Sequence, residues 1–150
     1  MSLDARTRIA TAVAAREVSD LARGAAITAG QDFAPGELIA RMNATRIAQV
    51  AALDRAVLAE RVAGASWELI ADALGMPLAD VVARYEPIAN EWAERGRGGE
   101  VQLPAEHRGV RVGILNDTDL EGTAATVEAW IARHTELWDA PANVTLSARI

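Results

Sequence analysis

Apolar side chains recur at intervals of three and four residues up to about residue 95, which is the pattern of helices with one buried face. This pattern predicts a helix over residues 3–23, a loop over residues 24–36 that contains Gly30 and Pro35, and a long helix over residues 37–63. We expect the long helix to support the elements that follow it, because its apolar stripe is continuous. The stripe consists of Leu38, Ile39, Met42, Ile47, Val50, Leu53, Val57, Leu58 and Val62.

A short helix, a glycine turn and a second helix are predicted next. Ser66 can cap the short helix, and Gly75 can adopt the left-handed conformation that ends a helix. Pro77 suits the first turn of the second helix, because its missing N–H would be unpaired there in any case. The apolar spacing carries the second helix through Pro87 as far as Ala93.

The spacing of three residues around this turn is typical of a helix-turn-helix. Two helices that cross at a steep angle need a small residue at their closest approach and a branched apolar residue in the gap, and Ala71 and Val81 fit these roles around Gly75. The stretch Gly64–Tyr85 resembles, mainly in its first half, the helix-turn-helix of small DNA-binding regulators of GC-rich bacteria. The resemblance implies a tri-helical domain whose second motif helix contacts DNA.

The second motif helix departs from the pattern of that family. Where the family usually has Ser-Arg-Gln and further basic or amide residues, this chain has residues 77–80, Pro-Leu-Ala-Asp. The helix carries Arg84 against the carboxylates of Asp80, Glu86 and Glu91. This charge balance is unfavourable in the major groove, because phosphate neutralisation supplies most non-specific affinity. A carboxylate can nevertheless accept a hydrogen bond from cytosine, and an arginine can read guanine.

The composition changes at residues 95–99, Arg-Gly-Arg-Gly-Gly, which form a basic, glycine-rich linker. Residues 101–103 and 110–115 are rich in branched apolar residues and predict a β-hairpin, in the position where a winged-helix protein carries its wing. A last helix is predicted over residues 118–138. The expected fold is therefore mainly α: a tri-helical helix-turn-helix core with N- and C-terminal helices and a hairpin wing.

The expected organisation has three segments. Residues 1–30 form a docking or dimerisation helix, residues 31–95 the helix-turn-helix domain, and residues 96–150 the linker, hairpin and C-terminal helix. The 150-residue chain has a formal net charge of −6, fifteen basic residues that are all arginine, and no cysteine. The acidic balance argues against a nucleic-acid coat or a membrane-surface protein. No signal peptide or long apolar run is recognised, so a cytoplasmic location is expected.

No catalytic, metal or cofactor site is predicted. His107 and His134 lie far apart in the sequence, and there is no cysteine nucleophile and no glycine-rich phosphate loop. Residues 117–122, with Glu128, come close to the spacing of a calcium loop, which would make the chain a calcium-dependent module. We interpret these residues instead as an acidic helix N-terminus, which the helix dipole favours.

The DNA-binding hypothesis assigns residues in two groups. The residues expected to face outward at base edges are Leu78, Asp80 and Arg84, and those expected on phosphates are Arg95, Arg97, Arg108 and Arg111. The alternative interpretation of the two linker arginines is a solvated hinge.

Two functions remain open. The first is a DNA-binding transcriptional regulator that forms a homodimer through residues 3–23 or 118–138, because two half-sites multiply the affinity of one weak module. The second is an acidic adaptor or antitoxin-like protein, whose helix-turn-helix holds a basic protein partner.

Overall fold

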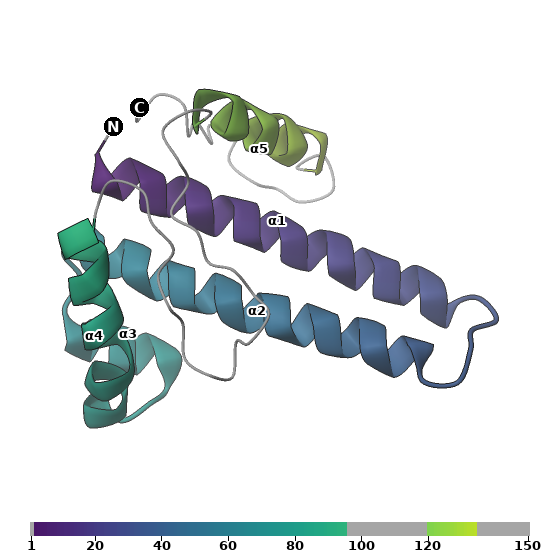
Figure 1. Cartoon of the computed structure of the whole chain (residues 1–150), viewed down its shortest axis with the longest axis horizontal. Helices are drawn as coiled ribbons and strands as arrows, with labels where there is room; N and C mark the ends of the chain where they lie inside the picture. Colours follow the sequence, from purple (N-terminus) through teal and green to yellow (C-terminus); the bar gives the residue numbers. More distant parts are fainter. Residues whose placement is uncertain (1, 96–119, 135–150) are drawn as a thin grey trace.

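The structure is a computed structural model that describes residues 2–95 and 120–134. This part of the chain contains five helices and no strand, so the mainly helical fold is confirmed. Two long antiparallel helices, α1 (Leu3–Ala29) and α2 (Glu37–Val62), form a hairpin that runs the length of the molecule (Figure 1). The predicted β-hairpin wing and residues 96–99 of the basic linker lie outside the described residues.

Three shorter helices pack on this hairpin. The helices α3 (Trp67–Leu74) and α4 (Leu78–Arg95) lie together at the end where α1 begins and α2 ends, and α5 (Leu120–His134) lies along α1 on the side away from α2 (Figure 1). At the opposite end, around the α1–α2 loop, no further helix of the described part covers the hairpin. The hairpin therefore has a covered half and a bare half.

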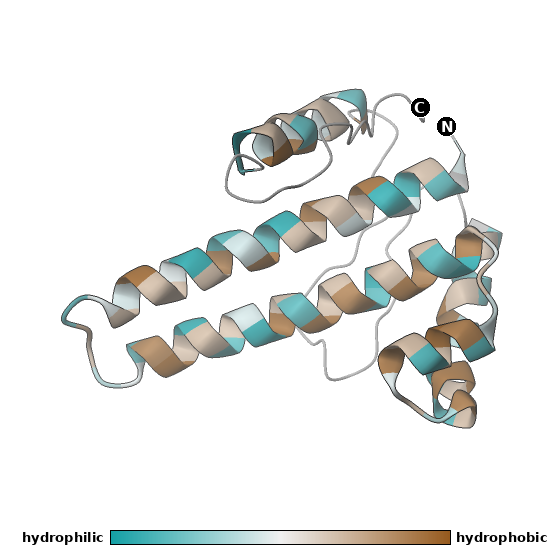
Figure 2. Cartoon of the chain, turned by 180° about the vertical axis from the view of Figure 1, so that it is seen from behind, coloured by the Kyte–Doolittle hydropathy of each residue, from teal (hydrophilic) through white to brown (hydrophobic). Residues whose placement is uncertain are grey.

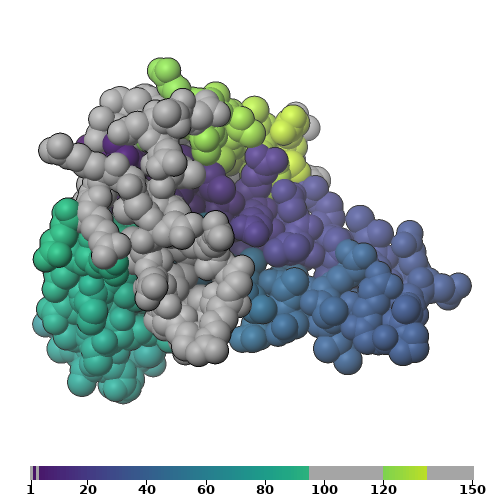
Figure 3. All heavy atoms as spheres, in the orientation of Figure 1, coloured from purple at the N-terminus to yellow at the C-terminus, as the bar shows by residue number. Residues whose placement is uncertain are grey.

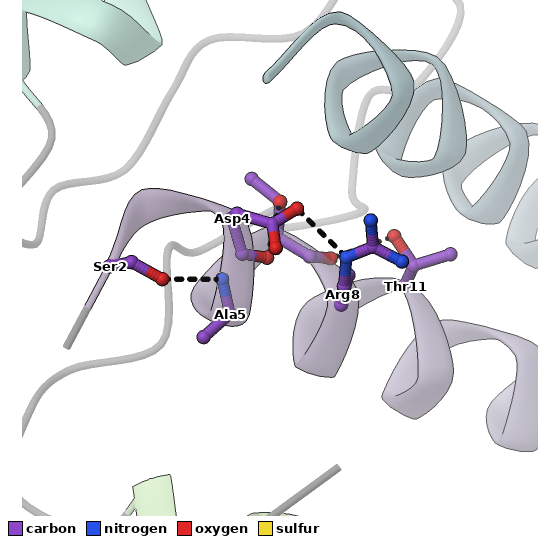
Figure 4. A network of polar contacts seen from close by, with 6 residues as sticks. Ser2, Asp4, Ala5, Arg8 and Thr11 are labelled. Carbon is purple, nitrogen blue, oxygen red and sulfur yellow. Dashed lines mark hydrogen bonds and ion pairs between the residues drawn. The ribbon is translucent and has the colours of Figure 1, made fainter. Parts of the chain in front are cut away.

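Side chains fix the beginning of α1. The Oγ of Ser2 accepts a hydrogen bond from the Ala5 amide at 3.2 Å, and the Arg8 guanidinium donates to the Asp4 carboxylate at 2.8 Å (Figure 4). The first contact satisfies an amide that has no partner within the helix, and the second joins neighbours on one helical face.

The helix α1 extends to Ala29, beyond the predicted end at residue 23, and passes through Gly24. A glycine costs a helix only about 1 kcal/mol relative to alanine, so packing against α2 can outweigh it. Alanines supply most of the buried apolar residues of α1 and allow close approach of a neighbouring helix. The buried alanines of α1 and α2 are Ala5, Ala10, Ala14, Ala25, Ala48 and Ala51.

The core of the molecule has two parts. The larger cluster joins the C-terminal half of α2 to α3 and α4, and consists of Ala51, Val57, Leu58, Ile70, Ala71, Val81, Tyr85, Ile88 and Trp92. The smaller cluster joins α1 to α5 through Ile9, Leu120 and Ala124. Residues 3–23 and 118–138 were the two segments expected to form a homodimer, and the described helices in them pack against each other within one chain.

The predicted inner stripe of α2 is wrong in its N-terminal part. Val57 and Leu58 are buried, but Ile39 and Met42 are 77% and 55% exposed. For these two residues the reason is coverage rather than helical phase, because α3 and α4 reach only the C-terminal half of α2. Leu53, within the C-terminal half, is also exposed, at 46%. The same periodic stripe is therefore core at one end of the helix and surface at the other.

Candidate functional site

The turn between α3 and α4 is sharp, as the sequence predicts. Gly75 has φ +63° and ψ 31°, which is the left-handed region that glycine favours. The Met76 amide donates to the Ala71 carbonyl at 3.1 Å and closes the end of α3. Ala71 is 4% exposed and Val81 is fully buried, and both belong to the larger core cluster. The predicted bend at Gly75 is confirmed.

The beginning of α3 is held by its cap and by a cation–π contact. The Oγ of Ser66 accepts a hydrogen bond from the Leu69 amide at 3.2 Å, as predicted for the cap. The Arg61 guanidinium lies 4.4 Å from the centre of the Trp67 ring and donates to the Ala65 carbonyl. These contacts join the end of α2 to the start of α3, so the position of the short helix is fixed.

A buried carboxylate on α2 anchors α4. Asp54 is 1% exposed and accepts a hydrogen bond from the Tyr85 hydroxyl at 2.7 Å, while the Arg84 guanidinium lies 3.5 Å from the same carboxylate oxygen. The guanidinium carbon is also 5.2 Å from the centre of the Tyr85 ring. Burial, followed by the hydrogen bond to Asp54, raises the pKa of Tyr85 to about 12.

The expected outward orientation of Arg84 is therefore wrong. Its side chain is 27% exposed and lies against Asp54 instead of extending from the outer face of α4. The physical reason is that a buried carboxylate is costly without an opposite charge and hydrogen-bond donors. Sequence reasoning missed Asp54, although its place among the inward-facing residues near Val57 and Leu58 is an available signal, because a carboxylate in a buried stripe needs a partner.

Exposed side chains of two kinds surround the turn. We define the 68–80 surface as the exposed residues Glu68, Leu69, Asp72, Met76, Leu78 and Asp80. Leu69, Met76 and Leu78 are 60%, 37% and 41% exposed, although each is large and apolar. In Figure 2, brown marks hydrophobic residues, and much of α3 and the start of α4 is brown. Leu78 and Asp80 are thus on the outside, as predicted.

Carboxylates outnumber basic side chains around this surface, even with Arg61 counted, whose guanidinium lies over the Trp67 ring. Between Gly64 and Glu94 the sequence contains six carboxylates and one arginine, which is Arg84. Because the Arg84 guanidinium lies against Asp54, the 68–80 surface itself has three carboxylates and no basic side chain. Of the four predicted phosphate contacts, Arg95 is the last residue of α4, and Arg97, Arg108 and Arg111 lie outside the described residues.

A separate cavity of about 620 Å³ lies between α1 and α5. Its walls include the apolar residues Val13, Leu21 and Val127 and the charged pair Arg16 and Asp20, which are 3.6 Å apart. The size suits a small molecule, but the charged pair in the wall is satisfied internally and indicates no ligand chemistry.

Two further properties of the described residues concern metal binding and membrane insertion. No group of three His, Cys, Asp or Glu side chains within residues 2–95 and 120–134 is arranged to hold a metal ion. His134 contacts Arg23 at 3.0 Å and the Trp130 carbonyl at 2.7 Å. Residues 117–119 of the calcium-like segment lie outside the described part, and Glu121 is in the first turn of α5.

No helix in the described part combines the length and apolar character needed to span a bilayer.

Comparisons of the chain with models of protein families, with curated proteins and with solved structures found no match. Function is therefore inferred from the chemistry of the 68–80 surface and from the contacts that hold it in place.

Proposed function

We propose that this chain is a non-catalytic adaptor whose helix-turn-helix binds a basic protein partner through the 68–80 surface. The observation that carries the proposal is the exposure of three large apolar side chains among three carboxylates at a sharply bent, well-anchored pair of helices. Exposed apolar side chains supply the area that an interface buries, and the surrounding carboxylates select the charge of the partner.

The partner that fits this surface carries apolar residues together with arginine or lysine. Leu69, Met76 and Leu78 would enter apolar contacts, with Met76 adaptable in shape because its side chain is flexible. The carboxylates of Glu68, Asp72 and Asp80 would lie at the rim and attract a basic partner from a distance. An amphipathic basic helix combines both features in one element.

A titration with a synthetic basic amphipathic helix, followed by fluorescence anisotropy, tests the proposal. We expect binding that weakens as salt is added, because the rim charges are solvent-exposed. Leu69→Asp together with Leu78→Asp should abolish binding, and Asp72→Arg together with Asp80→Arg should weaken it. The matched control is Asp32→Arg, which changes an exposed carboxylate in the loop at the other end of the hairpin. Equal binding by all four proteins would contradict the proposal.

DNA binding is the second candidate. It is favoured by the bend at Gly75, which leaves Leu78 and Asp80 exposed on the first turn of α4, as a recognition helix requires. The dimeric regulator hypothesis places base contacts on this turn and phosphate contacts on Arg95, Arg97, Arg108 and Arg111. The carboxylates of the 68–80 surface oppose it, because they would repel DNA phosphates.

Anisotropy with labelled genomic fragments at low salt separates the two candidates. A DNA-binding regulator should bind with an affinity that falls steeply as salt increases. Arg97→Ala with Arg108→Ala should then reduce the slope of that salt dependence by about one for each phosphate that is no longer neutralised. The adaptor function predicts no binding to any fragment under conditions in which the basic helix binds.

A further inference from the structure

The bare half of the α1–α2 hairpin exposes a second group of large apolar side chains. We define the distal surface as Ile27, Phe33, Ile39 and Met42, which are 56%, 46%, 77% and 55% exposed. They come from the end of α1, the connecting loop and the start of α2, so they gather at one end of the molecule. Figure 3 shows this end projecting beyond the part of the hairpin that carries α3, α4 and α5. A cluster of exposed apolar residues of this kind marks an interaction surface.

The charge of the distal half distinguishes it from the rest of the molecule. Residues 24–53 contain two acidic and two basic side chains, whereas the whole chain has a net charge of −6. The Glu37 carboxylate pairs with the Arg41 guanidinium at 3.0 Å, and the Arg46 guanidinium donates to the Asn43 amide oxygen at 3.1 Å. Two copies that meet at this half do not repel each other, whereas two copies that meet at the acidic 68–80 surface do.

The size of the distal half is also suitable for a dimer. A segment of α2 from Glu37 to Leu53 is roughly 25 Å long, and two adjacent helices are roughly 20 Å wide. The face of the hairpin therefore has a flat area of roughly 500 Å², to which the projecting side chains add further accessible surface. A stable dimer buries about 800 Å² on each partner. The distal half therefore offers an area of the required order, and a pair of antiparallel helices is half of a four-helix bundle.

We propose that two copies of this chain associate through their distal surfaces, hairpin against hairpin, as a two-fold symmetric four-helix bundle. This arrangement covers Ile39 and Met42, which share one face of α2, on both copies and leaves the two 68–80 surfaces at opposite, outer ends. Each dimer then presents two binding surfaces, and a partner with two matching sites gains affinity from the linkage. The proposal does not depend on what the 68–80 surface binds.

Multi-angle light scattering and sedimentation of the full chain over a concentration series test the association. We expect a dimer, and we expect Ile39→Glu together with Met42→Glu to raise its dissociation constant by about 30-fold or more, which corresponds to the removal of a hot-spot residue. The matched control is Leu69→Glu together with Leu78→Glu, which places the same charges on the 68–80 surface and leaves the dimer intact. A wild-type monomer from about 1 μM to 1 mM, or a dimer that both double variants retain equally, overturns the proposal.

A distance measurement gives an answer that does not depend on disruptive variants. The chain has no cysteine, so one introduced thiol carries a spin label at a single position. A label at Gln49→Cys, exposed on the same face of α2 as Met42, should give a short distance between copies, and a label at Ala73→Cys, on the exposed surface of α3, should give a long one. The reverse order of distances would place the contact at α3 and overturn the proposal.

Discussion

A single buried carboxylate, that of Asp54, determines the orientation of two side chains on α4, those of Arg84 and Tyr85. The carboxylate lies on α2 inside the larger core, so it needs donors, and the two residues on α4 that can reach it supply a hydroxyl and a guanidinium. These contacts link α2 and α4 at a defined position. Arg84, which was expected to read bases, instead has a structural role.

Tyr85 should make the stability of the protein depend on pH in the alkaline range. Its pKa is raised to about 12 in the folded protein, against about 10 in an unfolded chain. The folded state therefore holds the proton more tightly, and the stabilisation is complete below pH 10 and is lost as pH rises toward 12. We expect the free energy of unfolding to fall by on the order of 2 kcal/mol over this range.

The alkaline loss of stability can be assigned to the Tyr85 hydroxyl by its absorbance. The chain contains one tyrosine, no lysine and no cysteine, and Arg55, whose pKa burial lowers, does not contribute to the absorbance of tyrosinate. Ultraviolet absorbance of tyrosinate follows the titration directly, and urea unfolding at several pH values gives the stability. Tyr85→Phe should remove the pH dependence. A hydroxyl that titrates near pH 10 in the folded protein would contradict the contact with Asp54.

Replacement of Asp54 by alanine should destabilise the fold. The Tyr85 hydroxyl and the Arg84 guanidinium would no longer have their shared acceptor, at a cost of about 2–3 kcal/mol because Arg84 is partly exposed and can still reach water. Urea unfolding measures the change. Asp80→Ala is the control, since Asp80 is exposed and its replacement should change stability by less than about 0.5 kcal/mol. Equal effects of the two substitutions would refute the anchoring role.

At the level of the element, the bend between α3 and α4 depends on the backbone of one residue. Gly75 has φ +63°, and a Cβ built there would meet no atom within 4 Å. The glycine is therefore required for its conformation and not for space. By contrast, Gly24 lies inside α1, where alanine is the preferred residue.

Alanine substitutions at these two glycines should have opposite effects. Gly75→Ala forces a side chain into the left-handed region and should destabilise the protein by about 1–2 kcal/mol. Gly24→Ala should stabilise it by about 0.5–1 kcal/mol, because the nearest atom to the new Cβ is Arg41 Nη1 at an ordinary 3.9 Å. Urea unfolding of both variants provides the comparison. Stabilisation by Gly75→Ala would show that the turn does not have the described geometry.

At the scale of the whole molecule, α1 joins the two parts of the core. One side of α1 packs on α2, which supports α3 and α4, and another side packs on α5 through Ile9. The covered half of the hairpin is therefore three helices thick or more, and the bare half has two. This asymmetry separates the anchored 68–80 surface from the distal surface.

The docking of α5 on α1 should be sensitive to overpacking. Ala124 is fully buried in the cluster with Ile9 and Leu120, so Ala124→Leu should destabilise the protein by about 1–3 kcal/mol. Ala125→Leu, on the exposed side of the same helix, is the matched control. Thermal unfolding followed by circular dichroism measures both. If Ala124→Leu were neutral, α5 would not pack on α1 as described.

The described helices and the Gly75 turn could be predicted because local chemistry determines them. Ser66 caps α3 with its own hydroxyl, and Gly75 ends it with a conformation that other residues avoid, so a few neighbouring residues contain the necessary information. The boundary of α1 was less predictable, because Gly24 carries a small local penalty that a distant helix outweighs. The candidate site was predicted in part: Leu78 and Asp80 are exposed, while Arg84 lies against Asp54.

The sequence by itself determined where the chain bends around Gly64 and Gly75 and which residues share a helical face, because both depend on backbone preferences within a few residues. The tertiary structure alone decided which part of each face is covered. Ile39 and Val57 belong to one apolar stripe, yet only Val57 lies under other helices. Burial depends on the position of elements distant in sequence, and this dependence also created the Asp54 anchor and the two exposed apolar surfaces.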